Sequence, residues 1–474
     1  MFNWTLALPE IVLCLCGMAI MIVGVLNKRD SFVLCSMLTL GALLLAGVLV
    51  VSTAWGEGFH GQFVVDPFSG FVKVLILIGA ALSLVLSLDY NRSQGIARFE
   101  FPVLVLFSTV GMMLMASASN MMTLYVGLEL QSLALYVLAA FARDDLRSAE
   151  AGLKYFVLSA LASGLLLYGI SLVYGFSGTM DFAQLAHAVA DPAQPPAGLV
   201  IGIVFVLVGL AFKVSAVPFH MWTPDVYEGA PTPVTMFFAT APKVAAMALL
   251  VRVMIVPFGH LTHQWHQLVV IVSIASMVLG ALAAIGQTNI KRLMAYSSIG
   301  HMGYALIGVA AGTPEGIRGV LVYLVIYVFM NAAAFAGIAA MRRDGRMVET
   351  ISDLNGLSRN DPLLALVLAI TMFSLAGIPV MSGFFAKLYI FLAAVQTGQW
   401  TLAIIGVLTS VVGAFYYLRV IKVMYFDPPA ERFDRRSPSL SFVAATGGLF
   451  TTFFFLFPAP VVGAAQLAAH ALFG

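Results

Sequence analysis

The sequence predicts an all-α polytopic membrane protein with about fourteen transmembrane helices. Hydrophobic residues make up 61% of the 474-residue chain and charged residues only 10%, and the mean hydropathy is +0.99. Apolar runs of about 20 residues, enough to cross a bilayer as a helix, follow one another with short connections. Basic residues gather in alternate connections, as expected if every run crosses the membrane.

The first apolar run has neither a basic start nor a small-residue cleavage motif, so we expect a spanning helix and not a signal peptide. The expected spans are roughly 6–26, 32–53, 68–88, 101–118, 121–141, 153–175, 197–216, 233–256, 267–286, 293–311, 317–340, 362–395, 400–426 and 440–458. The run 362–395 is interrupted at residues 376–379, which predicts two half-helices. We expect small amphipathic turns at the membrane interface within 180–196 and 347–358.

The positions of lysine and arginine predict the orientation, because cytoplasmic loops carry an excess of both. The odd-numbered connections contain Lys28, Arg29, Arg92, Arg98, Arg143, Arg147, Lys291, Arg292, Arg342, Arg343, Arg346, Arg359, Lys422, Arg432, Arg435 and Arg436. The even-numbered connections contain Arg318, with Arg252 near a helix end. We therefore expect the odd connections in the cytoplasm and both termini on the opposite side.

A weak internal repeat relates two interrupted runs. The segment FKVSAVP at 212–218 aligns with FSLAGIP at 373–379, five spans later. An odd offset reverses the direction of travel through the membrane, so we expect two inverted five-helix repeats with broken helices 7 and 12, as in many transporters. We expect a single membrane domain, 1–474: helices 1–3 in 1–100, a first repeat in 101–256, a second in 267–426, and the last helix and tail in 440–474.

Lysines have an unusual distribution, because five of the eight lie within apolar runs: Lys73, Lys154, Lys213, Lys243 and Lys387. A charged side chain at mid-membrane costs at least ~2.5–3.5 kcal/mol and usually faces the bundle interior or a water-filled cavity. A desolvated lysine releases its proton readily, whereas arginine stays charged. We therefore expect an ion pathway, although Lys73 and Lys154 lie near span starts and could extend to the surface instead.

Two further groups are candidates for this pathway. Glu129 is the acidic residue placed centrally in an expected span, where a carboxylate would be protonated or paired. We expect its partner to be Lys213 or Lys154. His301 is a candidate proton relay, with a hydrogen-bonded packing role as the alternative. Glu10 follows Pro9 at the first helix start, where we expect it to act as a cap.

Other site classes receive no support from the sequence. Cys14, Cys16 and Cys35 lie inside apolar runs, and two thiols at Cys-x-Cys spacing on a helix point to different faces. The histidines His260, His263 and His266 have no neighbouring carboxylate or cysteine, so an interfacial stretch is expected there and not a metal site. Without a basic block, a nucleic-acid partner is excluded.

Several motifs together resemble the antiporter-like membrane subunits of respiratory complex I, the NADH-quinone oxidoreductase. They are GLELQSLALY at 127–136, FKVSAVPFHMWTPDVYEGAPTP at 212–233, APK at 241–243, QTNIKRLMAYSSIGH at 287–301 and GIPVMSGFFAK at 377–387. Three features favour the subunit N type. Residue 387 is a lysine, where subunit M carries glutamate, and the chain ends sixteen residues after its last span, without subunit L's long lateral helix. The residue sequence of the first motif, GLELQSL, is also more similar to subunit N than to subunit M.

This resemblance implies a proton-translocating membrane-arm subunit of a bacterial inner-membrane complex, with both termini in the periplasm. It implies that Glu129 pairs with Lys213 and that Lys243 and Lys387 continue a hydrated path along the midplane, supported by Lys154 and His301. No cofactor or metal is expected in this chain; FMN, iron–sulfur clusters and quinone are expected in partner subunits. The implied partners are neighbouring K-type and M-type subunits and lipids.

Two alternative functions remain open from the sequence. A subunit of a multi-subunit cation/proton antiporter, without redox coupling, would share the same motifs. A quinone-binding or purely structural element is the other alternative. A quinone site needs polar anchors in a pocket near a membrane surface, whereas these lysines cluster in mid-span.

Overall fold

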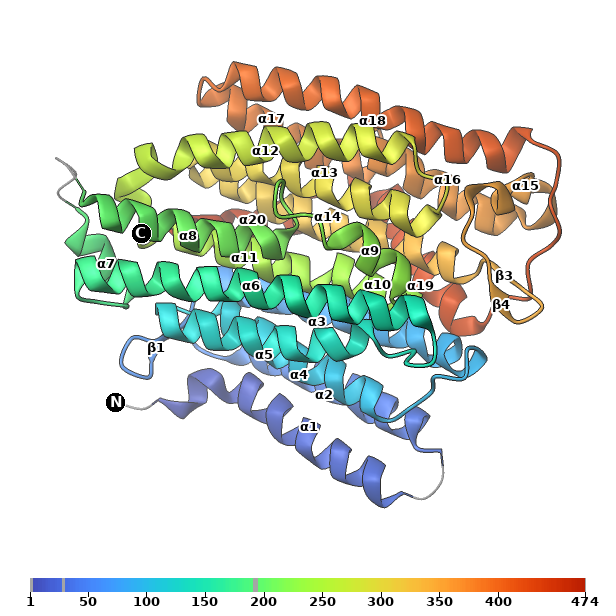
Figure 1. Ribbon diagram of the computed structural model, residues 1–474, viewed down its shortest axis with the longest axis horizontal. Coiled ribbons are helices and arrows are strands. Elements are labelled where there is room, and N and C mark those ends of the chain that lie inside the picture. The colour runs from blue at the N-terminus through green and yellow to red at the C-terminus, as the bar shows by residue number, and fades with distance from the viewer. Residues whose placement is uncertain (1–2, 28–29, 191–194, 474) are drawn as a thin grey trace.

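The computed structural model describes residues 3–27, 30–190 and 195–473 as a bundle of helices that run along one axis (Figure 1). Within these ranges, eleven helices are long and apolar enough to cross a membrane, and shorter apolar helices cover Glu100–Ala116, Pro362–Ala376 and Ser382–Gln396. The predicted all-helical polytopic class is confirmed at this level. Lys28 and Arg29, which entered the predicted orientation, lie outside the described residues.

The helices follow the expected spans closely. The first group is η1 (Trp4–Ala7), α1 (Leu8–Leu26), α2 (Phe32–Ser52), α3 (Pro67–Ser93), α4 (Glu100–Ala116), α5 (Met121–Ala139) and α6 (Leu146–Ser177). The second is α7 (Phe182–Ala188), α8 (Ala197–Val214), α9 (Thr223–Gly229), α10 (Thr232–Ala239), α11 (Ala241–Ile255), η2 (Gly259–Leu261) and α12 (Thr262–Ile285). The third is α13 (Ile290–Ala311), α14 (Pro314–Ala339), η3 (Ile351–Leu354), α15 (Leu357–Asn360), α16 (Pro362–Ala376), α17 (Ser382–Gln396), α18 (Trp400–Phe426), α19 (Pro438–Phe453), η4 (Phe454–Leu456) and α20 (Ala459–His470).

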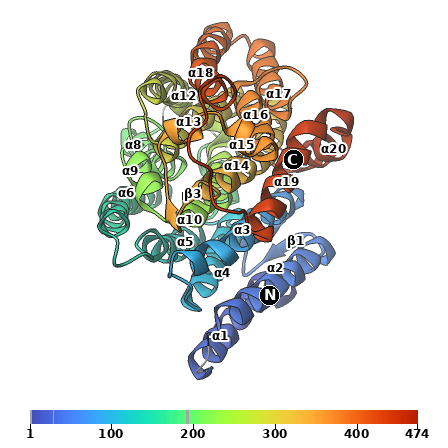
Figure 2. The same cartoon turned by 90° about the vertical axis from the view of Figure 1, so that its right-hand side faces the viewer.

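The core of the bundle consists of α10, α11 and α14. The segment Thr232–Ile255 is fully buried in its most apolar window and α14 is 94% buried, which is why these sequences are apolar on all sides. Helix α14 packs against α3, α13, α16, α17, α19 and α20. Helices α1 and α2 lie at one edge of the bundle, as the view along the helices shows (Figure 2).

Three interruptions divide the long apolar runs. Helix α8 ends at Val214, with Ser215 in the left-handed region at φ 63°. Helix α16 ends at Ala376 and is followed by Gly377, whose φ of +88° favours glycine, and Pro379 lies within the break. The third interruption was not predicted: the expected span 233–256 is divided at Thr240, two residues before Pro242 at the start of α11. Proline there has no N–H to continue the ladder.

Close approach of α16 and α17 depends on a second glycine. A Cβ added at Gly383 would lie 1.9 Å from the Ser374 carbonyl oxygen, so any side chain would push the half-helices apart. The Ser374 hydroxyl accepts a hydrogen bond from the Gly383 N–H at 2.9 Å. The break is therefore a packed and hydrogen-bonded structure.

Elements absent from the prediction lie in the connections and the tail. Antiparallel pairs form between β1 (Gly56–Gly58) and β2 (Phe63–Val65) and between β3 (Arg342–Arg343) and β4 (Arg346–Met347). The tail contains helix α20, packed on α14 and α3; hydropathy missed it because it is too short to span. Amphipathic turns expected within 180–196 and 347–358 occur as α7, η3 and α15, and residues 191–194 are outside the described ranges.

Two polar residues near the N-terminus differ from expectation. Lys73 does not extend to a surface, because its Nζ lies 2.6 Å from Glu10 Oε1 and both side chains are at least 96% buried. The ammonium also lies 4.8 Å from the centre of the Phe63 ring. Glu10 is therefore the partner of Lys73, joining α1 to α3, in addition to its place in the first turn of α1. Hydropathy could not reveal a pair formed across 63 residues of sequence.

Replacing Lys73 with methionine is expected to destabilise the assembled protein by about 3–5 kcal/mol, because Glu10 would be left as an unpaired buried carboxylate. The thermal stability of the solubilised native assembly measures this. The double variant Glu10→Gln/Lys73→Met, with no buried charge, should recover most of the loss. A single variant as stable as the wild type would contradict the pair.

Candidate functional site

Lys213 occupies the last turn of α8, immediately before the first interruption, and its side chain is buried. Its Nζ donates to Ser132 Oγ in α5 and Ser159 Oγ in α6, each at 2.7 Å. The Ser159 hydroxyl also accepts a hydrogen bond from Tyr136 at 2.7 Å. The ammonium is therefore held between three helices by neutral oxygens, an arrangement that stabilises a proton without locking it in an ion pair.

Glu129 does not form the predicted direct pair with Lys213 or Lys154. Within the described residues it makes no ion pair, and its Oε1 is buried without a hydrogen-bond partner. The carboxylate nevertheless interacts electrostatically with Lys213. A small side-chain movement changes the strength of such an interaction more readily than it breaks a contact pair, because the Coulomb energy varies with distance.

Lys154 lies in α6 and belongs to a separate charged group. Its Nζ is 2.7 Å from Glu150 Oε1 and 2.7 Å from Asp225 Oδ2. Arg292 from α13 contacts Asp225 at 2.7 Å and Glu228 at 2.9 Å. Partial burial would raise the pKa of the Asp225 carboxyl, but the bonds from Lys154 and Arg292 outweigh it and hold that pKa below its ordinary value. Asp225 therefore links α6 to α13 as a carboxylate.

Lys243, in the first turn of α11, is almost completely buried. Its Nζ donates to the Val214 carbonyl oxygen at 2.9 Å and to Ser215 Oγ, and lies 5.4 Å from the centre of the Trp222 ring. Val214 is the last residue of α8. Carbonyls at a helix C-terminus carry partial negative charge and attract cations, so the first interruption itself creates the acceptor site for Lys243.

Lys387, in α17, is placed in the same way at the second interruption. Its Nζ donates to the Leu375 and Ala376 carbonyl oxygens at 3.2 and 3.0 Å and to Ser410 Oγ at 2.8 Å. Ala376 is the last residue of α16. Each broken helix thus presents free carbonyls to a buried lysine that carries no acidic contact partner among the described residues.

His301 lies in α13 with both ring nitrogens bonded to tyrosine hydroxyls. Nδ1 is 2.5 Å from the Tyr323 oxygen and Nε2 is 3.1 Å from the Tyr417 oxygen. A cavity of about 10 Å³ lies between His301 and Lys387. That is about the size that one water molecule needs, so the predicted relay position for His301 has a geometric route to Lys387.

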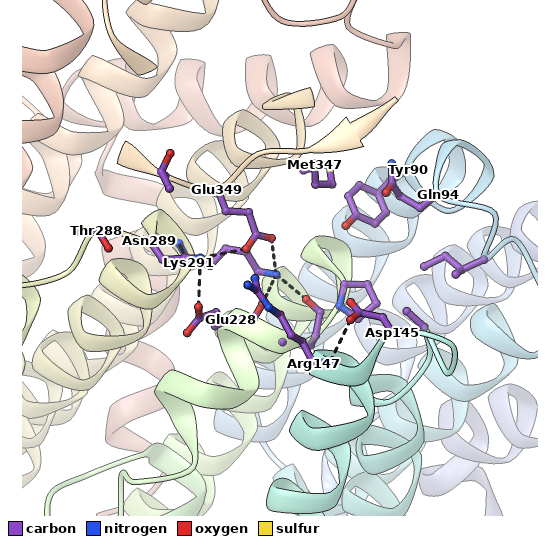
Figure 3. Close-up of a pocket in the computed structure, with 16 residues that line it drawn as sticks. Tyr90, Gln94, Asp145, Arg147, Glu228, Thr288, Asn289, Lys291, Met347 and Glu349 are labelled. Atoms are coloured by element: carbon purple, nitrogen blue, oxygen red, sulfur yellow. Dashed lines mark hydrogen bonds and ion pairs between the residues drawn. The ribbon is translucent and has the colours of Figure 1, made fainter. Parts of the chain in front are cut away.

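A larger polar cavity, of about 550 Å³, opens beside the α9–α10 junction (Figure 3). Lys291 on its wall is buried, and its Nζ donates to the Glu228 and Ala230 carbonyl oxygens at 2.8 and 2.7 Å. It also contacts Glu349 at 3.1 Å. A second cavity of about 240 Å³, lined by Lys154 and Asp225, shares Glu228 with the first.

The structure thus brings the predicted residues together only in part. Lys213 and Lys243 lie on the two sides of the first interruption, and His301 and Lys387 share one cavity. Glu129 and Lys154 remain apart from direct contact with them. Sequence reasoning missed the hydroxyl partners Ser132, Ser159, Tyr323, Tyr417 and Ser410, since serine and tyrosine within an apolar run give no distinctive signal. No group of three potential metal ligands occurs in the described part of the chain.

Comparison with known proteins gives a consistent answer. Residues 118–413 match the family described as NADH:quinone oxidoreductase/Mrp antiporter, TM. The NADH-quinone oxidoreductase subunit N of Granulibacter bethesdensis is 67% identical over 99% of both chains. A chain of respiratory complex I from Thermus thermophilus is 33% identical with a TM-score of 0.83, covering 97% of this chain and 99% of that one.

The fold also occurs in a complex that is not named as complex I. A chain of the Mrp complex from Dietzia has a TM-score of 0.89, covering 100% of this chain and 98% of that one, at 22% identity; this likeness concerns the fold alone. The family model and the full-length identity are what decide membership. The chain belongs to the family of NADH-quinone oxidoreductase subunit N, the multi-pass, proton-translocating subunits of the membrane arm of bacterial respiratory complex I.

Proposed function

We propose that this subunit moves protons along a path of buried side chains comprising Glu129, Lys213, Lys243, His301 and Lys387, with Lys154 in a supporting role. The observation that carries the proposal is the paired arrangement at the two interruptions: Lys243 on the carbonyls that end α8 and Lys387 on those that end α16. Both lysines are buried without acidic contacts in the described residues, so each can exist in a charged and a neutral form.

Charge transfer along this path starts at Glu129. When the Glu129 carboxylate approaches Lys213, the ammonium is stabilised; when it withdraws, the proton is released more easily. The released proton moves toward Lys243 and then through His301 to Lys387. Lys154 supports the path indirectly. It pairs with Asp225, and Asp225 also pairs with Arg292, which lies on the same helix as His301.

The architecture proposed for the path is fourteen spans with two inverted five-helix repeats, in which helices 7 and 12 are broken. In this scheme the domain is continuous over 1–474, with repeats in 101–256 and 267–426 between helices 1–3 (1–100) and the last helix and tail (440–474). Both chain ends are marked toward the same end of the helices, opposite β3–β4 and α15 (Figure 1). This arrangement supports a bacterial inner-membrane orientation with both termini periplasmic, because β3–β4 carries Arg342, Arg343 and Arg346.

The energy for translocation comes from outside this chain in the proposed scheme. FMN, iron–sulfur clusters and quinone are assigned to partner subunits, and K-type and M-type subunits and lipids are its neighbours. A tagged chain in solubilised membranes tests this: it should migrate on a native gel in a large band with NADH dehydrogenase activity. Migration in a smaller band without that activity would favour the antiporter alternative.

Replacing Glu129 with glutamine tests the switch. The uncharged amide cannot stabilise the Lys213 ammonium, so proton translocation by the assembled complex should fall by roughly tenfold or more. The matched control is Glu57→Gln, an exposed carboxylate in β1 that contacts none of the pathway residues and should matter little. Normal translocation in Glu129→Gln would remove this residue from the path.

A further inference from the structure

His301 is the centre of a hydrogen-bonded chain that the pathway above does not yet use. The chain runs from Ser297 to Tyr417, from Tyr417 to Nε2 of His301 at 3.1 Å, and from Nδ1 to Tyr323 at 2.5 Å. It joins three helices, since Ser297 and His301 lie on α13, Tyr323 on α14 and Tyr417 on α18. All four side chains are buried. These four side chains are therefore shielded from bulk solvent.

The hydrogen bonds of this chain can point in either of two directions, because imidazole has two neutral tautomers. A neutral histidine has one nitrogen that donates and one that accepts, whereas a tyrosine hydroxyl can do either. In one state Tyr417 donates to Nε2 and Nδ1–H donates to Tyr323; in the other state both directions are reversed. Because a hydroxyl rotates easily, the two tyrosines accommodate both tautomers without moving the ring.

We propose that Tyr323 and Tyr417 are positioning residues that hold His301 as a two-sided proton relay facing Lys387. This inference rests on the proposed pathway. A proton that arrives at one ring nitrogen forms the imidazolium, and loss of the proton from the other nitrogen leaves the opposite tautomer. One proton is gained and one is lost, and the two hydroxyls rotate to match the new tautomer. The first tautomer returns when the imidazole ring turns over and re-forms its two hydrogen bonds.

The connection to Lys387 passes beside Tyr417. The cavity of about 10 Å³ is lined by Ser297, His301, Tyr304, Lys387, Ser410 and Tyr417, among others. A water needs about 10–15 Å³ and two to four polar partners, and these side chains supply them. Tyr417 therefore both fixes the imidazole and borders the route that the proton takes to the lysine.

The test uses the assembled complex carrying Tyr417→Phe or Tyr323→Phe, each of which keeps the ring and removes the hydroxyl. We expect proton uptake per NADH oxidised to fall by about three- to tenfold, the effect of losing one positioning hydrogen bond. Tyr327→Phe is the matched control. Tyr327 is equally buried, lies one turn from Tyr323 on α14, and its ring is 5.5 Å from that of His301. Its hydroxyl donates to Ser298, not to the imidazole.

Combination with His301→Gln separates positioning from simple packing. If the tyrosines act through the imidazole, Tyr417→Phe should add little to the defect of His301→Gln, whereas a packing role would give additive defects. Additive defects, or normal uptake in both tyrosine variants beside an impaired His301→Gln, would overturn the relay and leave the pathway standing. Normal uptake in His301→Gln itself would overturn both the relay and the part of the pathway through this residue. Tyr323→Phe carries the test if Tyr417→Phe fails to assemble.

Discussion

Replacement of Lys213 by alanine is expected to leave the complex assembled and to reduce proton translocation by roughly tenfold or more. The assembly survives because Ser132 and Ser159, which accept the two hydrogen bonds from Lys213, are neutral. The two serines carry no charge that would be left unpaired when Lys213 is removed, and water can fill the space that its side chain occupied. Translocation fails because the group that receives a proton beside Glu129 is gone.

The initial rate of acidification of inside-out membrane vesicles after addition of NADH measures this effect. Lys422→Ala is the matched control, since Lys422 is 61% exposed at the end of α18 and pairs with Asp427. A native gel establishes equal assembly of the two variants. Acidification at the wild-type rate by an assembled Lys213→Ala complex would show that this lysine is not on the path.

Lys387→Arg is expected to have an equally large effect for a different reason. Arginine keeps a positive charge over the Leu375 and Ala376 carbonyls, so the stabilising interaction with the end of α16 persists. Arginine stays protonated in proteins, whereas a buried lysine can lose its proton. The variant therefore retains the charge but loses the change of charge, and translocation should fall by roughly tenfold or more.

This substitution distinguishes a proton carrier from a structural cation. Lys422→Arg, in which an exposed lysine changes in the same way, should be silent. Restored translocation in Lys387→Arg would mean that position 387 needs only a fixed positive charge. Lys387→Met then serves as the comparison, because it removes the charge altogether and leaves the carbonyls of α16 without their cation.

Much of the fold followed from local sequence. Runs of apolar residues predicted the helices, and the Pro-containing motifs at 212–218 and 373–379 predicted two of the three interruptions. These features are local: a helix that loses its hydrogen-bond donors to proline must end nearby. The division at Thr240 was missed because Pro242 was read as part of a continuous span, and α20 because it is too short to cross a bilayer.

The candidate site was predictable in its titratable residues and not in their partners. A lysine within an apolar run is conspicuous, so Lys213, Lys243 and Lys387 could be selected from sequence alone. Their acceptors are carbonyls freed by a helix end and hydroxyls of helices far away in the chain, and tertiary packing alone determines these. The same reason explains why the sequence left a surface position open for Lys73, which instead pairs with Glu10.

The most direct test of the pathway is the number of protons translocated per NADH oxidised by the purified complex reconstituted in liposomes. The account predicts a ratio below that of the wild type for Lys213→Ala and for Lys387→Arg, with Lys422→Ala unchanged, because each of the first two blocks the path through this subunit. Wild-type ratios in both assembled variants would contradict proton transfer through these lysines.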